Sequence, residues 1–579
     1  MVSVLGGRDF SGFRSKLFRV PGILFIRAGD DHARGVFRRE GRVYWSRAFP
    51  VVLEKYGYLD LDVAGPAALS AHGVTDRYDL ILVARQPDDF WRAELAGRLV
   101  AGRARTLVDG PLPPALLDAL RVEAGGPLEP AAVFRGTDDE LNEGAFASLG
   151  TAGLSRVAPM ASSKEQPVDP RLHWRALGVA ISEAQAAAWR VPTWDPVHWR
   201  VEPDADVLGE WDLEDGSSAS PALVRRGSLV GASFGIFEYL VQCHTAAPFE
   251  QGEFLATQTS HGIEAYLLAL LDRLIADAGG LRARVLPWPL GIDWALTIRH
   301  DYDRSLPLQR VAEVLDRHES AGTAATWYWR ASHYKALRLA RVRGRAAVAG
   351  AESADVARLV AARRRHEVAL HTERLWAAGS RERRVLERAA GVRVRGTSAH
   401  GDSTCSRFQG APNVLWAADQ GLAYTENLQN FHLQPHRFVT VRADGLAEAL
   451  DVLCLPKHQS FDRSTFEGET YAEHVAEVAP RYRGAGGLLQ VMNHPDVHGD
   501  AFFDLLEGLP RRGRLDWTAG RIASWWQATH DSSRLRVGAD PAGNVSATAR
   551  LDVSNAVVEL RRPDGTTTRR LLAAEAQAA

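Results

Sequence analysis

The sequence predicts an α/β protein in which a Rossmann-like domain precedes a longer β/α barrel and a small C-terminal β appendage. Three observations lead to this prediction. Short apolar runs alternate with helical stretches over residues 22–126, the same rhythm returns over 288–527, and polar and apolar residues alternate after Thr529. Strands alternating with helices are typical of parallel sheets, whereas strict alternation is typical of half-exposed strands. The 579 residues are also too many for a single hydrophobic core.

Residues 1–126 are predicted to form the Rossmann-like domain. The apolar, β-prone runs predict strands at 22–26, 59–63, 78–84 and 105–108, and helical spacing predicts helices at 49–56, 91–101 and 113–122. Asp30, Asp31 and His32 follow the first strand and are predicted to form a solvated loop.

Residues 127–285 are predicted to be a β-rich continuation that ends in a linker helix. Short strands are expected at 207–212, 221–224 and 228–232. Apolar residues at helical spacing then predict a helix over 260–278, which the pair Gly279-Gly280 would end.

Residues 286–530 are predicted to form the barrel, with strands at 294–298, 324–329, 367–371, 392–397, 453–455 and 488–492. In a β/α barrel the active groups gather at the carboxyl ends of the strands. The polar residues that follow these predicted strands are Asp301, Asp303, His371, His400 and His494. Over 531–579, the turn signals Pro541-Ala-Gly543 and Pro563-Asp-Gly565 predict a small β-hairpin appendage.

The run Leu296-Thr-Ile-Arg-His-Asp-Tyr-Asp303 places two carboxylates at positions i and i+2 of a strand end. Side chains with this spacing project to the same face, so Asp301 and Asp303 would stand side by side while His300 points away. Adjacent carboxylates repel each other unless a cation or a proton lies between them. The pattern therefore suits a metal ligand beside a general base, and the alternative is a strand end followed by a polar turn.

Composition excludes several classes of function. The 69 basic and 71 acidic residues nearly cancel, which argues against a nucleic-acid partner. Three widely spaced cysteines predict neither a disulfide framework nor a zinc ribbon, and they fit a reducing compartment. Apolar runs are too short for an integral membrane segment and no signal-peptide pattern is present, so a cytoplasmic location is expected. The basic and apolar stretch Phe10–Arg19 leaves peripheral contact with an anionic membrane surface open.

The segment from Thr297 to Trp526 resembles the polysaccharide deacetylases, or NodB-homology carbohydrate esterases, whose fold is a distorted (β/α) barrel. The resemblance is carried by "TIRHDYD", "HEVALHT", "LLQVMNHPDVHG" and "DWTAGRIASWW". It implies that Asp301 is the catalytic base, that Asp303 and His371 are metal ligands, and that His494 is the general acid.

Two segments depart from the family pattern. Leu375 stands where the family usually has a second histidine ligand, and "RVRGTSAHGDS" replaces an Arg-Pro-rich strand end. His400 follows a predicted strand at the same barrel mouth, and this position makes it the expected replacement ligand. The family's arginine, which orients the base carboxylate, would then correspond to Arg395. "LCLPKHQSFD" is similar to a less defined segment and gives His458 and Asp462 as substrate-binding residues.

The front domain resembles class I glutamine amidotransferases in "YDLILVA" and "VDGPLPPALLDAL". Such an enzyme needs a nucleophilic cysteine on a strand-to-helix turn. No cysteine precedes Cys243, so a structural or sugar-binding role is predicted for this domain instead.

The deacetylase resemblance implies a hydrolase with one divalent metal. The ligand set suits Zn²⁺, and Fe, Co or Ni would also fit His and Asp donors. The hydrolase would remove an acyl group, most simply N-acetyl, from an amino sugar of a cell-surface glycan, a glycolipid or its precursor. The alternative is a non-catalytic glycan-binding protein with a degenerate deacetylase barrel, which Leu375 favours.

Overall fold

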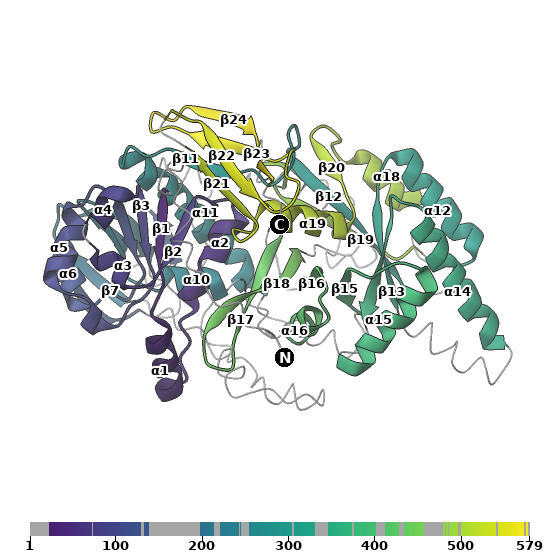
Figure 1. Ribbon diagram of the computed structural model, residues 1–579, viewed down its shortest axis with the longest axis horizontal. Helices are drawn as coiled ribbons and strands as arrows, with labels where there is room; N and C mark the ends of the chain where they lie inside the picture. The colour runs from purple at the N-terminus through teal and green to yellow at the C-terminus, as the bar shows by residue number, and fades with distance from the viewer. Residues whose placement is uncertain are drawn as a thin grey trace.

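The computed structural model places two large sheets side by side, with the C-terminal strands above their junction (Figure 1). The described residues are 22–71, 73–128, 133–137, 197–212, 220–242, 244, 254–303, 306–330, 345–372, 376–400, 411–427, 433–456, 479–480, 482–484, 486–495, 500–539, 542–572 and 575–576.

The first sheet has eight strands in the order β2-β1-β3-β4-β10-β9-β8-β6. Its parallel part comprises β1 (Ile23–Ile26), β2 (Leu61–Ala64), β3 (Leu80–Val83), β4 (Arg105–Val108) and β10 (Leu229–Ala232). Antiparallel strands β9 (Ser220–Arg226), β8 (Asp206–Asp212) and β6 (Val133–Gly136) extend it. The predicted Rossmann-like rhythm and the predicted β-rich continuation therefore form one sheet.

Helices of this half include α2 (Pro50–Lys55), α5 (Ala93–Ala101) and α6 (Pro114–Leu120), close to their predicted ranges. The predicted loop after the first strand is wrong, because residues Asp30–Glu40 form helix α1. Asp30 and Asp31 lie in its first turn, where negative charge complements the helix dipole. Its buried residues are Ala33 and Val36. Two apolar positions are too few to give a recognisable helical pattern in the sequence.

The second sheet is built mainly from parallel strands in the order β17-β18-β16-β15-β14-β13-β12-β19, with β20 beside β12. These strands are β12 (Trp294–Tyr302), β13 (Ala325–Arg330), β14 (Glu367–Thr372), β15 (Gly396–Ala399), β16 (Tyr424–Asn427), β17 (His436–Val441), β18 (Ala447–Pro456), β19 (Leu488–Asn493) and β20 (Arg514–Asp516). Within the described strands, β19 pairs with β12 and β17 pairs with β18. No strand pairing among the described strands joins β17 to β19, although the backbone N–H of Leu488 in β19 donates to the carbonyl of Leu433, just before β17, at 2.6 Å. The predicted barrel closure is not confirmed.

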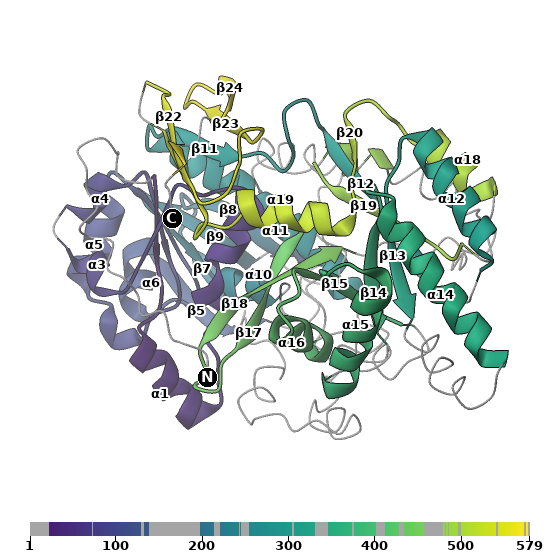
Figure 2. The same ribbon diagram turned by 45° about the vertical axis from the view of Figure 1, so that its right-hand side comes forward.

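Helices flank this sheet. They are α12 (Leu308–Ala321), α14 (Arg345–Ala362), α15 (Trp376–Ala390), α16 (Ala411–Asp419) and α18 (Asp500–Gly508). Helix α19 (Ala519–Thr529) lies across the amino-terminal ends of the strands (Figure 2). There the backbone N–H of Ala519 donates to Thr326 in β13, and that of Gly520 donates to Glu367 in β14. The opposite, carboxyl edge of the sheet is left for the site.

Helix α11 (Phe254–Asp277) joins the two halves, in the region where the sequence predicts a linker helix. Its apolar residues belong to a core that also contains residues of both sheets. Glu264 of α11 forms a buried ion pair with Lys55 of α2 at 3.0 Å. None of the helices that the structure describes combines the length and the apolar character needed to cross a membrane.

The C-terminal segment forms two hairpins rather than one. Strand β21 (Leu535–Ala539) pairs with β22 (Val545–Ala549), and β23 (Val557–Arg561) pairs with β24 (Thr567–Leu571). β23 also pairs antiparallel with β11 (Arg282–Val285), which follows α11. The hairpins are thereby tied to the middle of the chain, whereas the predicted domain boundaries stay predictions.

Gly57 marks a close contact between the front of the chain and β11. Its φ is +77°, and a Cβ there would overlap the backbone carbonyl of Val285. We expect Gly57→Ala to cost about 1–2 kcal/mol for the left-handed backbone and about 1–3 kcal/mol more for the overlap. Gly41→Ala is the matched control, because Gly41 also has a positive φ but open space at its Cβ position. Urea unfolding that gives equal losses for the two variants would contradict this contact.

Candidate metal centre

The candidate site lies at the carboxyl ends of four strands of the second sheet. Asp303 follows β12, His371 lies near the end of β14, His400 follows β15 and His494 follows β19. These strands run parallel, so their carboxyl ends meet at the same edge, where ligands bind in sheets of this kind.

Alternation along β12 selects the side chains that face the site. Arg299, Asp301 and Asp303 share one face, because side chains at i and i+2 project to the same side. His300 points to the other side and meets His318 of α12, with 2.7 Å between their Nε2 atoms. The predicted orientation of His300, away from the carboxylates, agrees with this arrangement.

Three imidazoles surround the Asp303 carboxylate. His400 Nε2 lies 3.2 Å and His494 Nε2 3.3 Å from Asp303 Oδ2, and His371 Nε2 lies 3.5 Å from Asp303 Oδ1. His371 Nε2 is also 3.4 Å from Asp301 Oδ2. The structure thus brings together five of the residues singled out in the sequence.

His371 is arranged as a neutral ligand. Its Nδ1 lies 3.2 Å from the carbonyl oxygen of Ser398 in the neighbouring strand β15. An Nδ1–H that donates to this carbonyl leaves the lone pair of Nε2 directed at the carboxylates. Burial lowers the pKa of His371 to about 4, so the ring is neutral at pH 7.

Asp303 is arranged as an anionic ligand. Burial alone would raise its pKa, but hydrogen bonds from His400 and His494 outweigh burial and hold the pKa well below its usual range. Its Oδ1 is buried and accepts no hydrogen bond. One donor atom each from Asp303, His371 and His400 lie within 4.8 Å of one another. One carboxylate and two imidazoles in this space fit a divalent transition metal.

Asp301 is held by an arginine that the sequence analysis did not single out. Arg299 donates from Nε to Asp301 Oδ1 at 2.5 Å and from Nη2 to Oδ2 at 2.6 Å. Its Nη1 donates to Glu426, which also accepts from Tyr328 at 2.5 Å and from Gln490 at 2.7 Å. Arg299 and Asp301 are both buried. Burial alone would lower the pKa of Arg299, but the carboxylates of Asp301 and Glu426 outweigh this effect and raise it. Its position two residues before Asp301 was the signal, because it shares the face of the carboxylates.

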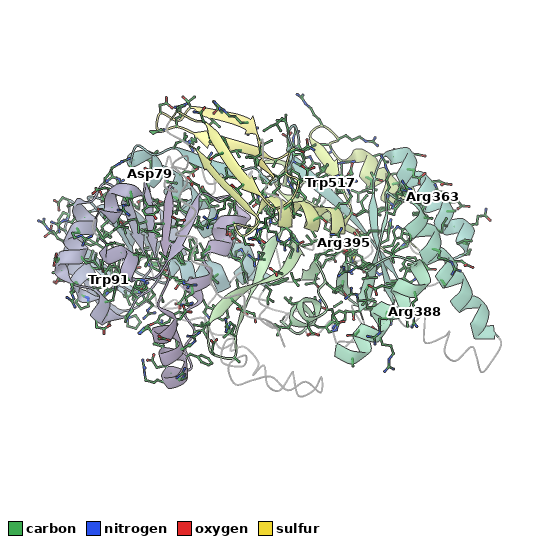
Figure 3. All side chains as sticks on the ribbon, in the orientation of Figure 1. Asp79, Trp91, Arg363, Arg388, Arg395 and Trp517 are labelled. Carbon is green, nitrogen blue, oxygen red and sulfur yellow. The ribbon has the colours of Figure 1, made fainter. Side chains whose placement is uncertain are left out.

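The prediction that Arg395 orients Asp301 does not agree with the structure. Arg395 is exposed and donates to Ser524 of α19 at 2.5 Å, at the amino-terminal side of the sheet (Figure 3). Arg395 precedes β15 whereas His400 follows it, so the two residues lie at opposite ends of one strand. The "RVRGTS" segment therefore supplies no guanidinium to the site.

Replacing Arg299 is expected to destabilise the fold far more than replacing Arg395. Arg299→Gln leaves the buried carboxylates of Asp301 and Glu426 without their shared cation, a loss of about 3–5 kcal/mol. Arg395→Gln changes an exposed group and is expected to stay within about 0.5 kcal/mol of wild type. Urea unfolding of both variants measures the difference, and equal stabilities would contradict the assigned partners.

The charges of the buried network are unbalanced. Asp301, Asp303 and Glu426 carry three negative charges, and Arg299 supplies one positive charge among these four residues. The histidines that contact Asp303 add no charge when neutral. A divalent cation held by Asp303, His371 and His400 would supply the two missing positive charges.

Several residues named in the sequence analysis lie outside the described ranges. These are the stretch Phe10–Arg19, Cys243, Leu375, His458 and Asp462. The substrate-binding roles of His458 and Asp462 stay predictions.

Comparisons with known proteins give weak similarities. No protein-family model matches the chain, and no curated protein matches it. Among solved structures, a putative polysaccharide deacetylase from Mycobacterium smegmatis is 18% identical, with a TM-score of 0.28, over 41% of this chain and 91% of that one. A CE4 family pseudoenzyme from Bacillus anthracis is 12% identical, with a TM-score of 0.25, over 41% and 66%. A glutamine amidotransferase from Thermotoga maritima is 11% identical, with a TM-score of 0.25, over 45% and 99%. Because these TM-scores lie well below 0.5, the account of function rests on the geometry of the site.

Proposed function

We propose that the protein is a metal-dependent hydrolase that removes an acyl group, most simply N-acetyl, from an amino sugar. The substrate would belong to a cell-surface glycan, a glycolipid or its precursor. One observation carries the proposal: Asp303, His371 and His400 converge within 4.8 Å beside a second carboxylate, Asp301, that a buried arginine holds in place. The cytoplasmic location stays a prediction.

Asp303, His371 and His400 are proposed to hold one divalent cation, Zn²⁺. A cation there would supply Lewis acidity and lower the pKa of water. His371 is suited to this role because it is neutral and its ring is fixed by the Ser398 carbonyl.

Asp301 is proposed to act as the general base. Its Oδ2 lies 3.4 Å from His371 Nε2, so a water molecule near the ligand nitrogens is within reach of this oxygen. The bidentate contact with Arg299 fixes the orientation of the carboxylate, and Glu426, Tyr328 and Gln490 hold the arginine network in turn. Asp301 therefore accepts the proton of the attacking water without a rotation of its side chain.

His494 is proposed to act as the general acid. Its side chain is 17% exposed, compared with 2% for His371 and 4% for His400, so it faces the side from which a substrate enters. Its Nε2 lies 3.3 Å from Asp303 Oδ2, which keeps the ring at the edge of the site. A protonated His494 donates its proton to the departing amine.

Metal removal followed by reconstitution tests the proposal. We expect chelator-treated protein to release no acetate from N-acetylglucosamine oligomers, and zinc to restore release with about one metal per chain. O-acetylated sugars are assayed in parallel, and acetate release from them distinguishes ester hydrolysis from amide hydrolysis. A protein that binds zinc and the oligomers but releases no acid would instead support the glycan-binding alternative.

A further inference from the structure

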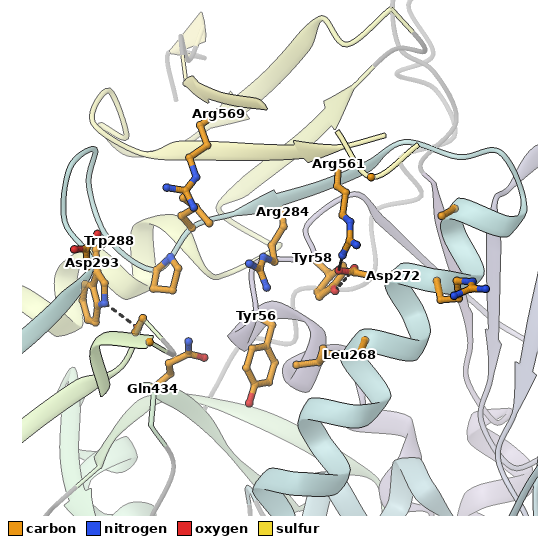
Figure 4. Close-up of a pocket in the computed structure, with 18 of the residues that line it drawn as sticks. Tyr56, Tyr58, Leu268, Asp272, Arg284, Trp288, Asp293, Gln434, Arg561 and Arg569 are labelled. Atoms are coloured by element: carbon orange, nitrogen blue, oxygen red, sulfur yellow. Dashed lines mark hydrogen bonds and ion pairs between the residues drawn. The ribbon is translucent and has the colours of Figure 1, made fainter. Parts of the chain in front are cut away.

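A large cavity lies away from the candidate metal centre. It has a volume of about 1020 Å³ and is enclosed by Tyr56 after α2, helix α11, the Arg284–Trp288 segment and the β23–β24 hairpin (Figure 4). We call it the arginine pocket, because six arginines and four aspartates line it. Its lining carries a net formal charge of two positive units.

The arginine pocket is separate from the metal centre. Asp293, which lines it, directly precedes β12, whereas Asp301 lies near the other end of that strand. Eight residues of extended chain span about 26 Å. Trp288, also in the lining, donates to the carbonyl of Gly486 just before β19. The pocket therefore lies at the amino-terminal ends of strands whose carboxyl ends carry Asp303 and His494.

The guanidinium groups around the pocket outnumber the carboxylates that pair with them. Glu559 accepts from Arg282, from Arg284 at 3.3 Å and from Arg569 at 3.1 Å. Asp272 pairs with Arg282 and, at 3.8 Å, with Arg561, and it also accepts from Tyr58. Four arginines thus share two carboxylates, which leaves positive charge for a further anion.

Arg284 has hydrogen-bonding capacity left for a ligand. In Figure 4 its side chain reaches into the middle of the cavity, between the Tyr56 ring on one side and Arg561 and Arg569 on the other. Its Nε is buried and has no hydrogen-bond partner. The side chain as a whole is nevertheless 28% exposed, and its Nη2 makes only a long contact of 3.3 Å with Glu559, so the terminal nitrogens of the guanidinium can meet an anionic oxygen in the pocket.

We propose that the arginine pocket binds a diphosphate-bearing ligand up to the size of a nucleotide. Forked guanidinium groups match phosphate oxygens in geometry and charge, and Arg284, Arg561 and Arg569 come from adjacent strands of one sheet, β11-β23-β24. The cavity is larger than one phosphate requires, and the half-buried ring of Tyr56 provides a face for a sugar or a base. This proposal is independent of the hydrolase function.

Isothermal titration of the full chain with inorganic pyrophosphate, against sulfate at equal ionic strength, tests the proposal. We expect one saturable site for pyrophosphate, and at least a tenfold weaker affinity in Arg284→Gln and in Arg561→Gln. Arg561 is 49% exposed and pairs with Asp272 only at 3.8 Å, so its replacement spares the fold. Arg310→Gln, at an exposed pair with Glu313 on α12, is expected to bind as wild type does, because neither residue lines this pocket.

Pyrophosphate also chelates metals, so His371→Ala is included as a further arm. It is expected to bind pyrophosphate as tightly as wild type, because the arginine pocket is remote from His371. Loss of binding in His371→Ala would place the anion at the metal centre and overturn the proposal. Absence of saturable binding, equal binding of sulfate, or unchanged affinity in both arginine variants would also overturn it.

Discussion

Replacing Asp301 with Asn is expected to lower kcat about 10²–10⁴-fold while the bound metal stays in place. The amide cannot accept the proton of the attacking water, although its oxygen still accepts a hydrogen bond from Arg299. The ligand atoms of Asp303, His371 and His400 are unchanged. Metal content by mass spectrometry and acetate release, measured on the same preparation, give the two quantities.

Asp303→Asn is the matched control for this prediction. The chemical change is the same and lies two residues along the chain, on the same face, but it removes the charge of a proposed ligand. We expect this variant to lose both metal and activity. Loss of metal in Asp301→Asn would instead make Asp301 a ligand, which its 3.4 Å distance from His371 Nε2 allows.

Replacing His371 with Ala is expected to reduce metal content from about one per chain to near zero and to abolish turnover. The variant removes one of three proposed ligands, and the nitrogen lost is the one that lies 3.4 Å from Asp301 Oδ2 and 3.5 Å from Asp303 Oδ1. Mass spectrometry after dialysis against trace zinc provides the measurement.

His494→Ala separates ligand from acid in the same experiment. His494 approaches Asp303 at nearly the same distance as His400 does, 3.3 Å against 3.2 Å. If His494 is the general acid, the His494→Ala variant is expected to lose turnover while its metal content stays unchanged. Retention of full metal content in His371→Ala, or its loss in His494→Ala, would contradict the ligand set.

Hydrophobic patterns in the sequence predict most strands of the two sheets and most of the helices that flank them. The predicted strands at 22–26 and 488–492 correspond to β1 and β19, because mainly apolar residues are buried on both faces of a parallel strand. The predicted strand at 105–108 coincides with β4. Strand 392–397 was placed too early, since β15 is Gly396–Ala399. Strand β17 (His436–Val441) was missed, because the sequence leaves its pairing with β18 undetermined until the chain folds.

The sequence predicts the site residues that lie within one short motif. It does not predict contacts between residues that are far apart in the chain. Strand periodicity places Asp301 and Asp303 on one face, and the resemblance to the deacetylase motif gives them their roles. The bond between Arg299 and Glu426 joins residues 127 positions apart, which no local pattern reveals. The resemblance to a family motif predicts Arg395 at the site, but Arg395 precedes β15 and therefore lies at the end of the strand away from the site.

The most direct test of the account is an anomalous difference map at the zinc edge from crystals grown with zinc. We expect one strong peak at the carboxyl edge of the second sheet, with Asp303, His371 and His400 as its protein ligands. A map without a peak among these three side chains, or with zinc bound elsewhere on the chain, would contradict it.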